Sequence, residues 1–192
     1  MIKAIIFDWG GVLGPDNNKE ASIILSEKYN ISYESLYNKL NTLEKKYFKK
    51  RNNAEYYSII SKEFKIPADE IKHTLNNVPP GNVLDFAKEI KKTHVKLFIL
   101  SNQMKPRTDA IKKNNDLSIF SDVFFSNELK MEKPNKEIFN FVMNKINLKP
   151  IEIIFIDNNK ENIDAARLLE WNVILYESLE QLIKELQDFG VD

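Results

Sequence analysis

The sequence predicts an α/β protein with a doubly wound parallel sheet and a small all-helical insertion after the first strand. Short, nearly continuous runs of apolar and β-branched residues recur along the chain, which is typical of strands buried on both faces of a parallel sheet. After residue 82 these runs alternate with helical patterns of about ten residues. Between residues 16 and 77 only helical patterns occur, so the regular alternation is interrupted there.

Each apolar run predicts one strand of the sheet. The five expected strands are Lys3–Phe7, Lys96–Leu100, Val123–Ser126, Ile153–Ile156 and Val173–Tyr176. The helices expected around the sheet are Val83–Lys92, Pro106–Asn114, Lys136–Ile146, Glu161–Glu170 and Leu179–Asp188. Strands that alternate with helices in this way indicate a doubly wound α/β domain.

The insertion carries four further helical patterns. They cover Lys19–Tyr29, Tyr33–Phe48, Ala54–Phe64 and Ala68–Asn76. A plausible start signal leads into each of them, namely Asp16, Ser32, Asn53 and Pro67. We therefore expect a helical domain over residues 16–77, inserted into an α/β domain that residues 1–15 and 78–192 form together.

Composition excludes several classes of protein. Twenty-eight basic residues balance 28 acidic ones, and this zero net charge argues against a general nucleic-acid or membrane-surface binder. The absence of cysteine excludes disulfides, thiolate metal sites and a cysteine nucleophile. No apolar stretch approaches the ~20 residues of a membrane span, and Asp8 interrupts the first one too early for a signal peptide. We expect a cytoplasmic protein, either a monomer or a homodimer.

Polar residues follow four of the expected strands. Asp8 ends the first strand, Ser101 and Asn102 end the second, Lys133 lies in the loop after the third, and Asp157 ends the fourth. In a parallel sheet the ligand site lies beyond the carboxyl ends of the strands. A carboxylate, a hydroxyl, an ammonium group and a second carboxylate are thus expected to meet in one crevice.

These residue types suit reaction with a phosphate ester. A carboxylate that attacks a phosphate dianion meets charge repulsion, which a divalent cation can offset. Mg²⁺ prefers oxygen ligands, and Asp8 and Asp157 with one backbone carbonyl are sufficient. Lys133 and Ser101 can bind phosphate oxygens. Backbone N–H groups near Gly10, Gly11 and Asn102 can complete the phosphate cradle.

Four sequence segments resemble, in order, the four motifs of the haloacid dehalogenase (HAD) superfamily. The segments are FDWGGVL, LSNQ, KMEKPNKEIF and FIDNNKENIDAARLLEWNVI. The resemblance implies a Rossmann-like core in which Asp8 is the nucleophile and Lys133 the matching lysine, and a fourth loop that supplies metal ligands. It also implies that the insertion is a type-1 cap, which selects the substrate. Within the superfamily, the chain most resembles the branch that contains bacterial sugar-1-phosphate phosphatases and the phosphatase domain of soluble epoxide hydrolase.

Two positions depart from the family pattern. Gly10 stands where the family has a second Asp, which acts as acid and base; losing such a group costs about 10²–10⁴-fold in rate. The Gly10 carbonyl can still bind the metal. Asn158 stands where a second acid is common, and it can hold a metal-bound water without adding charge. We therefore expect leaving groups that need little protonation, such as acyl, aryl and anomeric sugar phosphates.

The predicted function is Mg²⁺-dependent hydrolysis of a small phosphate monoester through an aspartyl-phosphate on Asp8, with a sugar phosphate as one candidate substrate. One alternative is a metal-independent 2-haloacid dehalogenase, which does not need an acid at position 10. Another is a weakened domain that binds a phosphorylated ligand or a protein. Tyr47 and Arg51 are the first insertion residues to consider as substrate contacts, and Trp9 is expected to pack in the core.

Overall fold

A five-stranded parallel sheet forms the centre of the protein. The structure is a computed structural model that describes residues 1–48, 53–77, 79, 81–91 and 93–191. The strands are β1 (Ala4–Phe7), β2 (Lys96–Ser101), β3 (Asp122–Phe125), β4 (Ile153–Asp157) and β5 (Asn172–Leu175). They lie in the order β3-β2-β1-β4-β5, all parallel. The predicted α/β class is confirmed.

Both faces of the sheet are buried, which explains why the strands are continuously apolar. Ile5 and Phe7 of the central strand β1 belong to one hydrophobic cluster, whereas Ala4 and Ile6 belong to a second cluster on the opposite face. All four residues are fully buried. Side chains of a strand alternate between faces, so a strand covered on both sides cannot carry a polar face.

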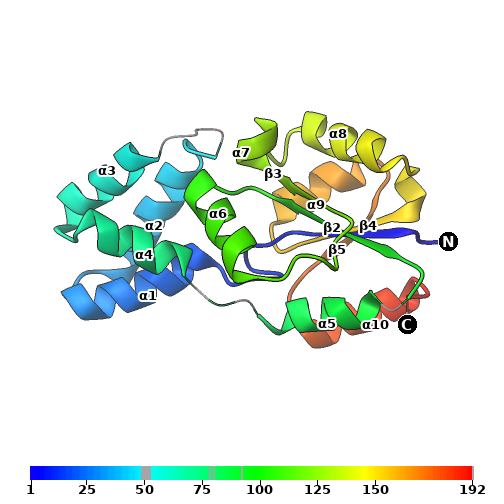
Figure 1. The fold of residues 1–192 in the computed structure, drawn as a ribbon, viewed down its shortest axis with the longest axis horizontal. Coiled ribbons are helices and arrows are strands. Elements are labelled where there is room, and N and C mark those ends of the chain that lie inside the picture. Colours follow the sequence, from blue (N-terminus) through cyan, green and yellow to red (C-terminus); the bar gives the residue numbers. More distant parts are fainter. Residues whose placement is uncertain (49–52, 78, 80, 92, 192) are drawn as a thin grey trace.

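Helices cover each face of the sheet (Figure 1). Side chains of α5 (Asn82–Ile90), α6 (Lys105–Asn114) and α10 (Leu179–Asp188) join the first cluster. Side chains of α8 (Lys136–Ile146) and α9 (Lys160–Arg167) join the second cluster. Two short elements complete this part, α7 (Ser126–Leu129) and the 3₁₀ turn η1 (Pro150–Glu152). Ser126, expected at the end of a strand, instead begins α7.

Between β1 and α5, the described residues form four helices, which we call the helical insertion. They are α1 (Asn17–Tyr29), α2 (Tyr33–Glu44), α3 (Ala54–Phe64) and α4 (Ala68–Asn76). Their buried leucine, isoleucine and tyrosine side chains form a third hydrophobic cluster, which Met104 joins from the loop before α6. A separate core of this kind supports our proposed division of the chain into residues 16–77 and the paired segments 1–15 and 78–192.

The boundaries of the insertion helices follow local hydrogen bonds. Asp16 accepts hydrogen bonds from the backbone N–H groups of Asn18 and Lys19, and so begins α1 as an N-cap. The second expected helix, 33–48, ends earlier than its pattern predicts. Residues 45–48 form turns in which the Tyr47 N–H bonds the carbonyl of Glu44 at 2.8 Å, so the helical ladder stops there.

A buried ion pair joins the helical insertion to the sheet-bearing part. The Arg107 guanidinium on α6 lies 2.6 Å from a carboxylate oxygen of Glu44 on α2, and both side chains are at least nine-tenths buried. Asn18 on α1 accepts from Arg107 at 3.2 Å and donates to Glu44 at 2.7 Å. One polar network therefore connects α1 and α2 of the helical insertion to α6 of the sheet-bearing part.

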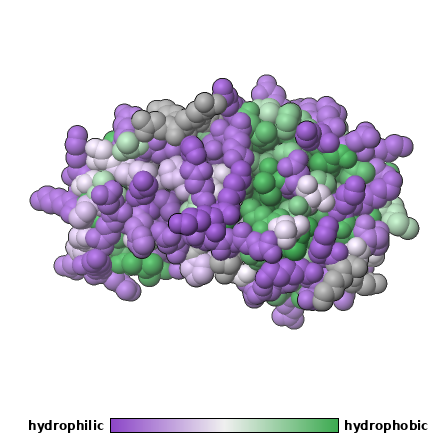
Figure 2. Space-filling model, in the orientation of Figure 1, coloured by the Kyte–Doolittle hydropathy of each residue, from purple (hydrophilic) through white to green (hydrophobic). Residues whose placement is uncertain are grey.

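The surface is mainly hydrophilic on the face that Figure 2 shows, and hydrophobic side chains gather there over the β3 edge of the sheet. Among the helices that the structure describes, none has both the length and the apolar character needed to cross a membrane.

Arg107→Ala is expected to lower the free energy of unfolding by about 3–5 kcal/mol, because Glu44 would remain buried without its cation. Lys105→Ala on the same helix is the matched control. It removes an ion pair with Asp109 that is more than half exposed, which is worth about 0–1 kcal/mol. Urea unfolding measures both values, and equal losses would contradict the assigned role of the buried pair.

Candidate active site

The register of the sheet brings two carboxylates together. Phe7 of β1 pairs with Ile156 of β4, and the Asp8 N–H donates to the Ile156 carbonyl at 2.8 Å. Asp8 follows Phe7 and Asp157 follows Ile156, so the two aspartates lie side by side at the carboxyl end of the sheet. Asp157 is fully buried and Asp8 is 7% exposed.

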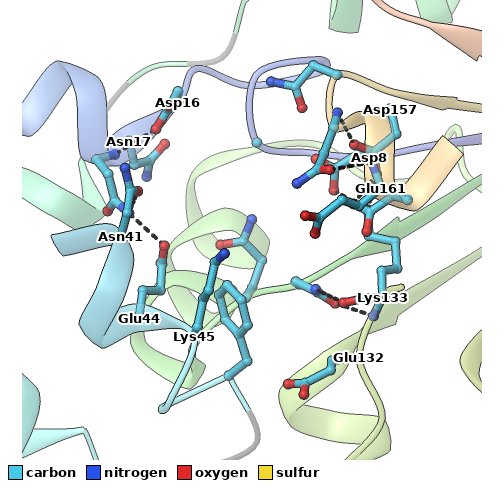
Figure 3. Close-up of a pocket in the computed structure, with 18 of the residues that line it drawn as sticks. Asp8, Asp16, Asn17, Asn41, Glu44, Lys45, Glu132, Lys133, Asp157 and Glu161 are labelled. Carbon is cyan, nitrogen blue, oxygen red and sulfur yellow. Dashed lines mark hydrogen bonds and ion pairs between the residues drawn. The ribbon is translucent and has the colours of Figure 1, made fainter. Parts of the chain in front are cut away.

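Lys133 bridges these two carboxylates (Figure 3). Its ammonium nitrogen lies 2.9 Å from Asp8 Oδ1 and 2.6 Å from Asp157 Oδ2. Burial lowers the pKa of Lys133, but the two carboxylates outweigh burial and hold this pKa above its usual value. Lys133 is therefore a permanent cation at neutral pH.

Asn102 fixes the loop that carries Lys133. Its side-chain oxygen accepts from the Lys133 N–H at 2.9 Å, and its amide nitrogen donates to the Lys133 carbonyl at 2.8 Å. Asn102 follows β2, so this pair of bonds links the end of β2 to the loop between α7 and α8. Asn102, whose backbone N–H was expected near the phosphate, thus uses its side chain to hold the lysine loop in place.

Two asparagines that the sequence did not single out hold Asp157. The Asn159 N–H donates to Oδ1 at 2.7 Å, and the Asn162 side chain donates to Oδ2 at 2.9 Å. Burial raises the pKa of Asp157, and Lys133 opposes that rise. Both asparagines lie in the fourth motif-like segment, where their spacing from Asp157 could have indicated this role.

Ser101 is buried and is not among the residues that line the cavity. Its oxygen accepts from the Trp9 N–H at 3.4 Å and from the Gln103 amide at 3.1 Å. A hydroxyl has two acceptor sites and one donor hydrogen. Since both acceptor sites are used, the hydroxyl hydrogen is available for an oxygen of a ligand.

The loop after β1 depends on glycine for space. Gly11 has φ of +80°, and a Cβ on it would lie 2.2 Å from the Asn158 side chain. The Gly11 N–H donates to the Gly14 carbonyl at 2.8 Å, so it is not offered to a phosphate as expected. Gly10 lines the cavity, and neither its own N–H nor its carbonyl oxygen takes part in that hydrogen bond. Trp9 packs against Gly14 in the core, which confirms its expected role.

A cavity of about 750 Å³ opens between the strand ends and the helical insertion. Figure 3 shows Asp8, Lys133 and Asp157 on one side of it, with insertion residues opposite. Of the expected site residues, the cavity is lined by Asp8, Gly10, Asn102, Lys133, Asp157 and Asn158. Tyr47 does not line the cavity, because its ring is buried in the third cluster. Arg51 lies outside the described residues.

The oxygen atoms at the strand ends fit a magnesium ion. The described part of the chain holds no group of three or more His, Cys, Asp or Glu side chains arranged for a metal. Mg²⁺ does not need one, because it binds through one or two carboxylates and keeps several waters. Asp8 and Asp157 supply two carboxylates against the single charge of Lys133, and Gly10 and Asn158 can add neutral oxygens.

The parallel sheet with a polar site at its carboxyl ends defines a Rossmann-like α/β protein. Its family follows from the sequence, which matches the family described as haloacid dehalogenase-like hydrolase over residues 5–188. The chain therefore belongs to this hydrolase family.

Known relatives are distant in sequence. The chain is 25% identical to the sesquiterpene phosphatase astK of Aspergillus oryzae over 173 residues, covering 86% of this chain and 85% of that protein. It is also 25% identical over 146 residues to the drimenol cyclase drtB of Aspergillus calidoustus. That second match covers 71% of this chain but only 28% of the cyclase, so the chain spans less than a third of that relative.

A solved structure has the same fold. The HAD family enzyme bt-2542 of Bacteroides thetaiotaomicron, in complex with magnesium and inorganic phosphate, superposes with a TM-score of 0.69 at 21% identity. The superposition covers 95% of this chain and 99% of that one.

A comparison of Gly11→Ala with Gly190→Ala separates the cost of crowding a side chain at position 11 from the cost of backbone strain. Both glycines have positive φ, which costs a residue with a Cβ about 1–2 kcal/mol, but a Cβ on Gly190 would meet nothing within 4 Å. Gly11→Ala is expected to lose about 1–3 kcal/mol more, because Asn158 must move. Urea unfolding of the two variants gives the difference, and equal losses would show that Asn158 does not restrict this position.

Proposed function

We propose that this hydrolase is a Mg²⁺-dependent phosphatase that cleaves a small phosphate monoester through an aspartyl-phosphate on Asp8. The main observation behind the proposal is that the ammonium group of Lys133 binds both carboxylates at the base of a polar cavity. The related phosphatase of Aspergillus oryzae and the related enzyme solved with magnesium and inorganic phosphate support it.

Each site residue has a role in this reaction. Lys133 holds Oδ1 of Asp8, so Oδ2 is the oxygen that attacks phosphorus. The Ser101 hydroxyl and the Lys133 ammonium stabilise the negative charge of the phosphate oxygens. Asp8, Asp157, the Gly10 carbonyl and Asn158 would hold Mg²⁺. When bound, this ion offsets the repulsion between the carboxylate and the phosphate dianion.

The helical insertion supports a hydrophilic leaving group. Its side of the cavity is lined by Asp16, Asn17, Asn18, Tyr37, Asn41, Glu44, Lys45 and Phe48, together with Pro15. Several of these groups already bond one another, as Tyr37 does to Asp16 and Asn18 does to Glu44. Their remaining donors and acceptors can bind hydroxyls, whereas an apolar chain would offer them nothing to bond. We therefore propose a hydroxyl-rich substrate such as a sugar phosphate, in contrast to the sesquiterpene named for the fungal relative.

Asp8→Asn is expected to lower phosphate release by roughly 10⁴-fold or more, because it removes the nucleophile. Release is measured with acetyl phosphate, p-nitrophenyl phosphate, glucose 1-phosphate and glucose 6-phosphate, with and without Mg²⁺. Asp188→Asn, an exposed substitution at the end of α10, is the control and should leave the rate unchanged.

Two results would contradict the phosphatase. Phosphate release that persists in Asp8→Asn would place the nucleophile elsewhere. No release from any of the four esters by folded, Mg²⁺-loaded protein would favour the dehalogenase or the binding protein, and halide release that survives chelation would identify the dehalogenase.

The glycine at position 10 predicts a preference among leaving groups. Glucose 1-phosphate should be cleaved faster than glucose 6-phosphate by roughly 10²-fold, since no side chain at position 10 protonates an alkoxide. Phenyl and p-nitrophenyl phosphate are the size-matched pair that controls for binding, because their leaving groups differ in basicity far more than in shape. Equal kcat/KM values within both pairs, which report the phosphorylation step alone, would show that another acid serves the leaving group.

A further inference from the structure

Gln103 is a buried residue of the cavity with no role in the reaction as proposed so far. It follows the Ser101-Asn102 pair at the end of β2, lines the cavity, and is only 3% exposed. Its backbone is fixed on two sides. The Gln103 N–H donates to the Ser126 hydroxyl at 3.0 Å, and the Asn127 side chain donates to the Gln103 carbonyl at 2.8 Å.

The side chain of Gln103 lies where a side chain at position 10 would point. A Cβ built on Gly10 would be 3.6 Å from the Gln103 amide nitrogen and 4.0 Å from Asp8 Oδ2. The amide nitrogen therefore faces the space that the missing acid and base would enter, and Oε1 of the same amide group lies more than 4 Å from that Cβ position. That space adjoins the carboxylate oxygen assigned to the attack.

One atom of the Gln103 amide has no partner. Its nitrogen donates to Ser101 Oγ at 3.1 Å, which fixes the orientation of the amide plane. Its oxygen, Oε1, is buried and finds no hydrogen-bond partner among the described residues. A buried acceptor without a donor is unfavourable and rare in native proteins. Oε1 is therefore a site where a bound ligand or water can donate a hydrogen bond.

We propose that Gln103 Oε1 accepts a hydrogen bond from the water that hydrolyses the aspartyl-phosphate, so that Gln103 positions this water in place of the base absent at Gly10. The inference rests on the proposed phosphatase reaction. A glutamine cannot take up the proton, but it can orient an attacking water, as a glutamine does in GTP hydrolysis.

The atoms of the step balance without a protein base. The water oxygen forms a bond to phosphorus, while the bond between phosphorus and the Asp8 oxygen breaks and Asp8 leaves as a carboxylate. One proton of the water moves to a phosphoryl oxygen, and the product is dihydrogen phosphate. The Gln103 oxygen acts only in this second step, because the first step uses Asp8 and the ester but no water, whereas the amide nitrogen supports Ser101 in both steps.

The two steps are separated with p-nitrophenyl phosphate and rapid mixing. The first turnover releases nitrophenol when Asp8 is phosphorylated, and later turnovers wait for hydrolysis of the aspartyl-phosphate. Gln103→Met fills a similar volume without an acceptor oxygen. It should slow the first turnover by no more than about fivefold, through the lost hydrogen bond to Ser101. It should also show a burst near one nitrophenol per protein and slow later turnovers by roughly 10²-fold.

A second variant tests the acceptor directly. Gln103→Glu retains an acceptor oxygen and adds a group that can take the proton, so its later turnovers should be at least as fast as in the wild type. Gln181→Met on α10 is the matched control for loss of a glutamine and should behave as the wild type. Thermal unfolding of each variant shows that the fold is kept.

The outcomes distinguish the inference from the function it rests on. Equal slowing of first and later turnovers in Gln103→Met, or slow later turnovers in Gln103→Glu, would overturn the role of Gln103. In either case the phosphatase itself would stand. Wild-type protein that releases no nitrophenol with Mg²⁺ would overturn the proposed function and this inference with it.

Discussion

The site depends on one buried ammonium group placed between two carboxylates. Strands β1 and β4 are neighbours in the sheet, so their ends bring Asp8 and Asp157 together in a place where neither charge is well solvated. Lys133 offsets that cost with two short ion pairs, and Asn102 holds its backbone. Breaking a buried pair of this kind typically costs about 3–5 kcal/mol, so the same contact that organises the chemistry also stabilises the sheet ends.

Much of the fold could be predicted because strand burial leaves a direct trace in the sequence. Every strand was expected within one residue at each end, and Lys136–Ile146 and Leu179–Asp188 match α8 and α10. The misses are local. The apolar pattern of the second insertion helix continues past Glu44, where the backbone turns, and the four-residue α7 is too short to show a helical period.

The candidate site could be predicted only in part, since sequence order gives strand ends but not side-chain contacts. Asp8, Lys133 and Asp157 meet as the strand order implies. The pairing of Arg107 with Glu44 joins residues 63 positions apart on two separate helices, and no sequence pattern connects them. Gln103 is the last residue of the motif-like segment LSNQ, yet its importance depends on the space left open at Gly10, which only the structure shows.

The central claim is that Asp8 becomes phosphorylated, and one measurement tests it most directly. Protein incubated with Mg²⁺ and acetyl phosphate is acid-quenched and treated with borohydride, which reduces an aspartyl-phosphate to homoserine. Peptide mass spectrometry then locates the change. Our account predicts homoserine at position 8 and unmodified aspartate at position 157. Homoserine at position 157, or none at position 8 while phosphate is being released, would contradict it.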